Sequence, residues 1–508
     1  MESGSEGFRL AELLAALSLA TDIGTGRPIG HGARTCLLSM AIGDRMGLDP
    51  KRLRSLFQTS LLKFLGCTAD ASETAAAVGG NELAFNATMG PVFYGGGAEI
   101  ARKMVMSVGN GEPFARKLRL LVGAMTDTES TRQGLAAHCE VAAMLATRLG
   151  MDEGAIQALR HVYERWDGKG FPAGLSDTDI PIEARIVAVA GDVDLLITAG
   201  TDPEEIISRR RGKGYDPDVV TAWHALERPS GEADWEQLMS TEPQPFSYIS
   251  DLDIALTAMA DFTDLKSPWT RGHSRNVADL ASGAAAIAGF PNADVRDMRR
   301  AGLVHDLGRV GVENGIWDRP GPLTSFDWEK VMIHPYLTGR ILSRCPALRN
   351  LEPLASGHHE RIDGSGYHHQ WEGDQISQAA RILAAADVFD AIRSDRPHRP
   401  GRGMDEALVV LREEAESGRL DTRAVAHVAA AAGGEIETPR RSNPDGLTDR
   451  EMEVLACIST GLTNRIVGEK LFISTKTVGR HVENIYTKIG VSTRAGAAIY
   501  AMEHGLLT

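Results

Sequence analysis

The chain has 508 residues, which is too many for one hydrophobic core and predicts two to four domains. Its net charge of −14 excludes a protein that coats nucleic acid with its whole surface, although it leaves room for one locally basic module. Five scattered cysteines without a C-x-x-C pair argue against structural zinc and fit a reducing cytoplasm. We find neither a secretory signal nor an apolar run of the ~18–20 residues that a membrane helix needs, so we expect a cytoplasmic protein with no membrane partner.

Apolar residues recur with helical periodicity along almost the whole chain, and the β-branched runs typical of strands are scarce. The sequence therefore predicts an all-α protein. The clearest expected helices span residues 10–21, 33–46, 50–64, 135–149, 276–288, 295–306, 325–343 and 404–416.

Two halves of the chain repeat one another. Gly30-His31 matches Gly272-His273 at an offset of 242 residues, and the glycine-rich loop 164–171 matches 360–367 at an offset of 196. The first copy therefore carries about 46 extra residues between Cys67 and Leu135. We predict a tandem duplication over residues 1–228 and 247–432, followed by a separate helical module over residues 445–508, with linkers of low periodicity between them.

The second copy gathers histidine and aspartate residues from several expected helices. Five histidines and two aspartates without a thiolate suit iron, manganese or another mid-row ion. Seven ligands are too many for one tetrahedral zinc and about right for two ions that share a bridging carboxylate. The alternative is a set of unrelated surface histidines. The candidate metal ligands are His273, His305, Asp306, His334, His358, His359 and Asp387.

The first copy has lost most of this set. Lys63-Phe64 stands at the place of the His-Asp pair, Val162-Tyr163 at the place of the His-His pair, and Gly191 at the place of Asp387. Only His31 and His138 remain, and two isolated imidazoles cannot hold two ions against hydration. We therefore expect a degenerate copy that keeps the fold without the metal, with structural pairing, dimerisation or ligand sensing as its role.

The second copy resembles the HD-GYP family of metal-dependent phosphodiesterases, a branch of the HD superfamily. The resemblance covers roughly residues 255–400 in the family's order, through the motifs 272–274, 303–308, 334–335, 358–367 and 385–391. It implies hydrolysis of cyclic di-GMP with two or three divalent transition-metal ions, with Asp306 as the bridging, catalytic ligand. The residues that it places at the substrate are Arg309, which would also act in catalysis, Asp363, Gly366 and Tyr367.

Three residues depart from that family's pattern. Arg309 replaces its usual lysine, His368 replaces the proline of its Gly-Tyr-Pro signature, and Trp269 replaces the glutamate of members with a third metal. We therefore expect two ions rather than three. Two other functions stay open: a non-catalytic receptor in which a bound nucleotide controls DNA binding, and another HD-superfamily phosphohydrolase that acts on a nucleoside mono- or triphosphate.

The last module has the pattern of a helix-turn-helix domain. Thr448 and Glu451 form a capping box before a first helix, and further helices are expected over residues 464–471, 475–489 and about 494–504. The module resembles the LuxR-type (GerE-like) DNA-binding domain over its full length. That resemblance implies double-stranded DNA as a partner and a homodimer formed through the last helix. It implies DNA contacts from Lys476, Thr477, Arg480, His481 and Lys488.

The lead hypothesis is a cytoplasmic transcription regulator with two tandem HD-type helical domains and a small four-helix DNA-binding domain.

Overall fold

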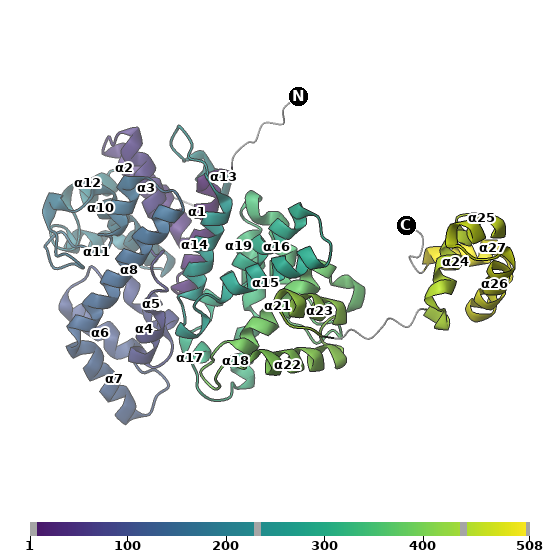
Figure 1. Cartoon of the computed structure of the whole chain (residues 1–508). Helices are drawn as coiled ribbons and strands as arrows, with labels where there is room; N and C mark the ends of the chain where they lie inside the picture. Colours follow the sequence, from purple (N-terminus) through teal and green to yellow (C-terminus); the bar gives the residue numbers. More distant parts are fainter. Residues whose placement is uncertain (1–7, 228–234, 437–443, 504–508) are drawn as a thin grey trace. The chain divides into compact units, whose positions relative to one another are not determined.

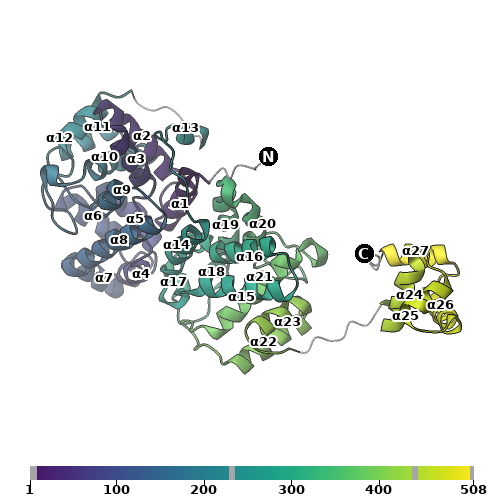
Figure 2. The same ribbon diagram turned by 45° about the horizontal axis from the view of Figure 1, so that its top comes forward.

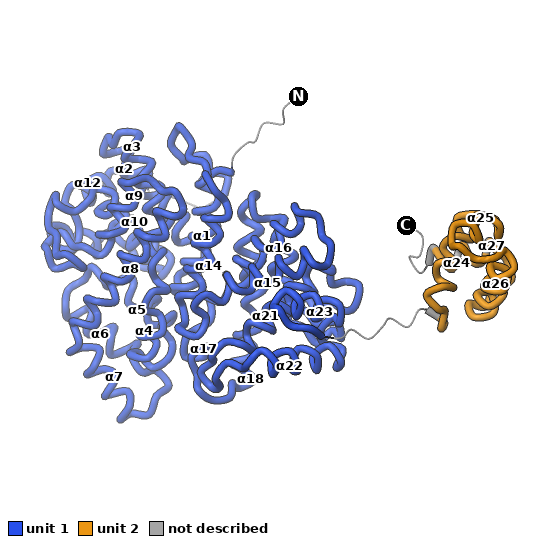
Figure 3. The backbone as a smooth tube through the Cα atoms, viewed as in Figure 1, with its two compact units in different colours: residues 1–436 blue, residues 437–508 orange. Residues whose placement is uncertain are grey.

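The computed structural model of the chain describes residues 8–227, 235–436 and 444–503. Within these ranges the protein consists of helices, with isolated β-bridges and no strand, so the predicted all-α class is confirmed. The chain divides into two compact units, residues 1–436 and residues 437–508 (Figure 3). No described helix combines the length and the apolar character that spanning a membrane requires.

The first unit contains both copies of the repeat, and their helices begin at matching positions. The first copy occupies one side of the unit and the second copy the other (Figures 1 and 2). Helices α1 (Leu10–Gly24), α2 (His31–Arg45) and α3 (Pro50–Leu61) correspond to α14 (Leu252–Asp264), α15 (His273–Ile287) and α16 (Asn292–Val304). Further along, α10 (Ile182–Thr198) corresponds to α21 (Gln378–Arg393).

Matching side-chain contacts accompany the matching helices. The backbone N–H of Gly32 donates to Asp22 in the first copy, and that of Ser274 donates to Asp264 in the second. Each glycine-rich loop is held by a buried glutamate that accepts from a backbone N–H nine residues later, at Glu164 and Glu360. The two copies therefore share detailed geometry as well as helix order.

One hydrophobic core joins the two copies, since a single buried cluster runs from Leu10 to Ile436. Helix α1 packs on α2 and α3 of its own copy and also on η4 (Leu307–Gly311) and α19 (His334–Leu342) of the other. Its Leu13, Leu14 and Leu17 are fully buried, and burial of each side chain contributes about 1.5–3 kcal/mol. The two copies therefore fold around one shared core.

The extra residues of the first copy form an insert of four helices. These are α4 (Ala71–Val78), α5 (Glu82–Met89), α6 (Gly97–Ser107) and α7 (Phe114–Thr126), and the chain then enters α8 (Thr128–Arg148). The insert also contacts the second copy: buried Glu82 pairs with Lys266 at 2.8 Å and accepts from the backbone N–H of Asn314. The Gly315 N–H donates to Gly80 O at 2.8 Å.

The prediction of one continuous helix over residues 325–343 is wrong. The segment forms two helices, α18 (Ser325–Met332) and α19, with Ile333 between them. Pro335 has no N–H to donate within a helix, but it fits the first turn of a new one. The break makes His334 the first residue of α19.

The second unit has its own small core around Val454, Ile458, Val478 and Ile485. Its helices are α24 (Asp449–Ser459), α25 (Asn464–Leu471), α26 (Thr475–Ile489) and α27 (Arg494–Glu503). Thr448 and Glu451 form the predicted capping box. The predicted end of the last helix at His504 lies outside the described residues.

Candidate metal centre

All seven predicted metal ligands lie together in the second copy. His273 opens α15, His305 and Asp306 follow α16, and His334 opens α19. The His-His pair follows the short helix α20 (Glu352–Ser356), and Asp387 lies within α21. Their donor atoms form three groups within 4.8 Å: His334, His358 and His359; His273, His305 and Asp387; and His305, Asp306 and His358.

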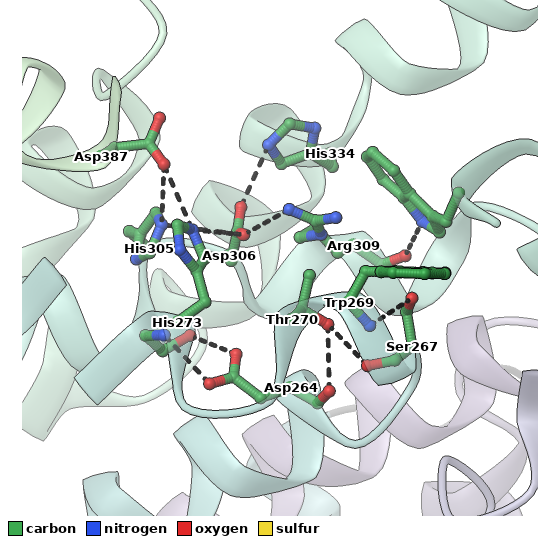
Figure 4. Close-up of polar contacts among 12 residues, drawn as sticks. Asp264, Ser267, Trp269, Thr270, His273, His305, Asp306, Arg309, His334 and Asp387 are labelled. Carbon is green, nitrogen blue, oxygen red and sulfur yellow. Dashed lines mark hydrogen bonds and ion pairs between the residues drawn. The ribbon is translucent and has the colours of Figure 1, made fainter. Parts of the chain in front are cut away.

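Asp306 lies at the centre of this cluster, between two sets of histidines (Figure 4). Its Oδ1 atom is 3.2 Å from His334 Nε2 and 3.6 Å from His358 Nε2. Its Oδ2 atom is 3.6 Å from His273 Nε2 and 3.7 Å from His305 Nε2. One carboxylate thus presents its two oxygens to different sides of the cluster, as a bridging ligand does.

Backbone carbonyls orient three of the histidines. In each, Nδ1 lies 2.6–2.7 Å from the carbonyl oxygen three residues earlier, so that Nδ1–H donates and the Nε2 lone pair faces the cluster. The pairs are His305 with Gly302, His334 with Val331, and His358 with Ala355.

A carboxylate that the sequence reasoning missed orients His273. Asp390 Oδ2 lies 2.6 Å from His273 Nδ1, and the opposite ring nitrogen lies 3.2 Å from Asp387 Oδ1. Asp390 stands three residues after Asp387 on α21, so both carboxylates project from one helix face. That spacing is the signal by which Asp390 could have been found.

The electrostatics of the cluster favour a bound cation. Although burial opposes ionisation, neighbouring Arg309 and the histidines hold the pKa of Asp306 well below its ordinary value, and His273 and His305 do the same for Asp387. Burial lowers the pKa of His358 to about 4, and burial together with the neighbouring His358 holds the pKa of His359 well below its ordinary value. The ionised carboxylates and the neutral imidazoles of His358 and His359 are donors that suit a divalent transition metal. Despite burial, which acts the other way, the same carboxylates raise the pKa of His273 to about 10 and also raise that of His305, so an ion would bind these two rings in exchange for their protons.

Two orphaned ring nitrogens support the same fit. His305 Nε2 and His359 Nδ1 are buried and have no hydrogen-bond partner. A buried polar atom without a partner costs about 1–3 kcal/mol, which coordination to a metal ion would offset. The residues present therefore fit the predicted metal.

The four predicted substrate residues fall into two groups. Arg309 and Tyr367 border the cluster: Arg309 Nη1 is 2.9 Å from Asp306 Oδ2, and the Tyr367 ring centroid is 4.4 Å from that of His359. Asp363 instead accepts from Ser365 within its own loop. A Cβ atom on Gly366 would lie 2.6 Å from Glu360 Cα, so this glycine permits a close backbone approach.

The degenerate copy replaces metal ligands with a cation of its own. His31 keeps the matching carboxylate contact, with Nδ1 2.7 Å from Asp194 Oδ2. Lys63 is buried, and its Nζ would lie 3.6 Å from a Cβ atom on Gly191, the position equivalent to Asp387. His138 pairs with Asp70. Among the described residues of this copy, no three donors come close enough to hold an ion.

The predicted DNA contacts lie on α26 of the second unit. Lys476, Thr477 and Arg480 are exposed, and His481 is half-buried with an Nδ1 atom that has no hydrogen-bond partner. Lys488 is engaged within the unit, because its Nζ lies 2.7 Å from Glu451 Oε2 and 2.8 Å from Gly446 O. The contact between Lys488 and a DNA phosphate stays a prediction, and a phosphate would have to compete with Glu451 for the Lys488 ammonium.

Comparison with protein families matches the chain to two models. The HD domain matches twice, over residues 118–219 and 257–424, and the luxR family of bacterial regulatory proteins matches residues 445–501.

Among curated proteins, the chain is 30% identical over 429 residues to a 3′3′-cGAMP-specific phosphodiesterase (number 3) of Vibrio cholerae. The match covers 81% of this chain and 92% of the relative. A cyclic di-GMP phosphodiesterase of Pseudomonas aeruginosa is 39% identical over 141 residues, which cover 28% of this chain and 34% of the relative. The crystal structure of a cyclic GMP-AMP-specific phosphodiesterase of V. cholerae superposes with a TM-score of 0.58 at 28% identity, covering 84% of this chain and 98% of that chain.

Proposed function

This chain belongs to the HD-domain family, and from that premise we propose that its second copy is a metal-dependent phosphodiesterase that cleaves a cyclic dinucleotide. The observation that carries the proposal is the convergence of Asp306 and six further donor residues in one cluster. The resemblance to the HD-GYP family implies cyclic di-GMP as the substrate, and relatives named for 3′3′-cGAMP and cyclic di-GMP favour the wider class of cyclic dinucleotides.

The proposed ligands would hold two divalent ions, with iron and manganese the best-suited metals. Such ions polarise a phosphodiester and lower the pKa of a bound water. Asp306 would serve both ions, because each carboxylate oxygen faces its own pair of histidines. Asp390 would hold the His273 ring with its Nε2 lone pair toward the cluster.

Arg309 would bind the phosphate of the substrate. Its guanidinium lies 3.9 Å from the Trp317 ring centroid, which restricts its motion, and it is at the edge of the cluster beside Asp306. A planar guanidinium binds two phosphate oxygens at once, whereas the family's lysine provides a point charge.

One observation favours a second candidate function, a receptor that binds the nucleotide without turnover. The contact between Arg309 and Asp306 Oδ2 uses an oxygen that a bridging ligand needs. If the guanidinium keeps this contact, it competes with an ion and leaves the site able to bind a phosphate more readily than to cleave it.

Metal analysis and product analysis separate these functions. We expect about two ions per purified wild-type chain and conversion of 3′3′-cGAMP or cyclic di-GMP to linear dinucleotides. Substitution of His305 and Asp306 by alanine should lower the metal content and abolish turnover. Unchanged metal content in that variant contradicts the ligand assignment, and a metal-loaded wild type that binds without cleaving supports the receptor.

We further propose that the second unit binds double-stranded DNA as a homodimer, so that the chain regulates transcription. Support comes from the luxR-family match and from the exposed basic residues on α26. Arg480→Ala in the full chain should weaken operator binding and reduce its dependence on salt, since each lost phosphate contact lowers the salt slope by about one. The matched control is Arg465→Ala on α25, where Arg465 pairs with Glu469 on the surface.

A further inference from the structure

The first copy carries a cleft of about 620 Å³ where the insert meets α11 (Pro203–Arg210). This volume lies in the range of small-molecule sites. Helix α6 of the insert forms one side of the cleft, and the second copy has no equivalent of that helix. The cleft is therefore a feature of the degenerate copy alone.

Basic side chains dominate the cleft, although the chain as a whole has a net charge of −14. The lining includes one acidic residue, Glu99, and six basic ones: Arg102, Lys103, Arg165, Arg209, Arg210 and Lys213. Such a local excess of positive charge in a concave surface concentrates anions.

Most of this positive charge has no ion-pair partner in the part of the chain that the structure describes. Arg165 pairs with Asp167, and Arg210 pairs with Asp192 and Glu99. The structure gives the other four, Arg102, Lys103, Arg209 and Lys213, neither an ion pair nor a side-chain hydrogen bond within the described residues. Four uncompensated cations around one cleft are suited to a ligand with several negative charges.

The backbone adds a second kind of anion-binding group. Gly95 and Gly96 line the cleft and precede the first turn of α6, and no side chain caps that helix. The N-terminus of an uncapped helix presents free N–H groups and the positive end of the helix dipole. Gly96 has open space where a side chain would lie, so a phosphate can approach these groups closely there, whereas the Glu99 carboxylate occupies that space at Gly95.

The cleft adjoins the degenerate site. Arg210 Nη1 lies 3.1 Å from Asp192, and the ring of the lining residue Tyr94 lies 5.3 Å from the buried Lys63 ammonium. The former metal site is thus closed by the chain's own charged side chains, and the open space lies beside it.

We propose that this cleft binds a nucleotide-sized organic anion carrying at least two phosphate charges. The inference goes beyond the phosphodiesterase proposal, because it uses no residue of the metal cluster. A ligand in this cleft would hold α6 against α11, which gives the insert a function. Glu82 and Gly80 of the same insert contact the second copy, so the insert connects the cleft to the copy that we propose to be catalytic.

Calorimetric titration of the full chain tests the proposal. The probes are pyrophosphate, ATP and 3′3′-cGAMP, each at low salt and in excess chelator, so that metal-dependent binding in the second copy does not contribute. The test variant is Arg102→Gln, Lys103→Gln and Arg209→Gln combined. The control variant is Arg45→Gln, Lys51→Gln and Arg52→Gln combined, which removes the same charge from exposed positions outside the cleft.

We expect at least one nucleotide probe to bind wild type and control equally, and the test variant about tenfold or more weakly. Raising the salt concentration should weaken binding, and Glu99→Gln should strengthen it, because that change removes the single lining carboxylate. Equal affinity in the test variant and the wild type overturns the proposal, as does the failure of both nucleotides to bind a correctly folded wild type. Nonspecific duplex DNA is titrated as a further probe: if it is the only ligand whose affinity falls in the test variant, the cleft is a nucleic-acid contact and the proposal is wrong.

Discussion

Replacement of Asp390 by asparagine tests whether the second copy is built to orient a metal ligand. Asp390 Oδ2 lies 2.6 Å from His273 Nδ1, and the residue is 8% exposed, so the contact is shielded from water. Asparagine keeps the shape but removes the charge that strengthens the imidazole as a donor. Loss of a carboxylate that orients a metal-binding histidine lowers metal affinity by about 10- to 100-fold, which is equivalent to about 1.4–2.7 kcal/mol.

The assay is competition between the purified protein and a fluorescent chelator for Mn²⁺. We expect the dissociation constant of the tighter-binding ion to rise by about 10- to 100-fold in Asp390→Asn. Asp294→Asn, an exposed change at the start of α16, is the control and should leave it unchanged. An Asp390→Asn protein with the wild-type dissociation constant would refute the reasoning that this carboxylate supports the site.

Three further predictions concern stability. Gly366→Ala should lower the free energy of unfolding by about 1–3 kcal/mol, because the new Cβ lies 2.6 Å from a backbone atom; Gly321→Ala, with open space around it, should not, and denaturant unfolding compares the two. Glu82→Gln should cost about 3–5 kcal/mol because it leaves Lys266 buried without its charge partner; a double-mutant cycle with Lys266→Met should return a coupling energy, and additivity would contradict the pairing. Burial raises the pKa of Asp22 to about 7, so the folded state retains a proton that the unfolded state releases and the Asp22 contribution to stability falls as pH rises from about 4 to 7. The free energy of unfolding of Asp22→Asn should therefore increase relative to that of the wild type as the pH rises from about 4 to 7. A difference between the two proteins that does not change with pH would contradict this prediction.

Local signals predicted the helices and the repeat because both depend on short-range patterns. The offsets that relate His31 to His273 also relate the helices that begin at these residues. Residues 325–343 show the limit of that reasoning. Their apolar periodicity continues through Pro335 and favours one helix, although the proline marks the point at which α18 ends and α19 begins.

The metal cluster could be predicted because its residue types are rare in combination, whereas its supporting contacts leave only a weak signal in the sequence. Asp390 acts on His273, which lies far away in the sequence, so only its three-residue spacing from Asp387 points to the contact. The basic cleft was missed for the same reason. Its cations come from the insert, from the glycine-rich loop and from α11, and none of these segments is unusual by itself.

The central claim is that the second copy cleaves a cyclic dinucleotide with metal ions held around Asp306. The most direct measurement is chromatographic analysis of 3′3′-cGAMP incubated with the manganese-loaded full chain, in wild type and in Asp306→Asn. We predict that the wild type forms a linear dinucleotide and that the variant is slower by about a hundredfold or more. Intact 3′3′-cGAMP after incubation with a wild type that holds two ions per chain, or undiminished turnover by the variant, would contradict the claim.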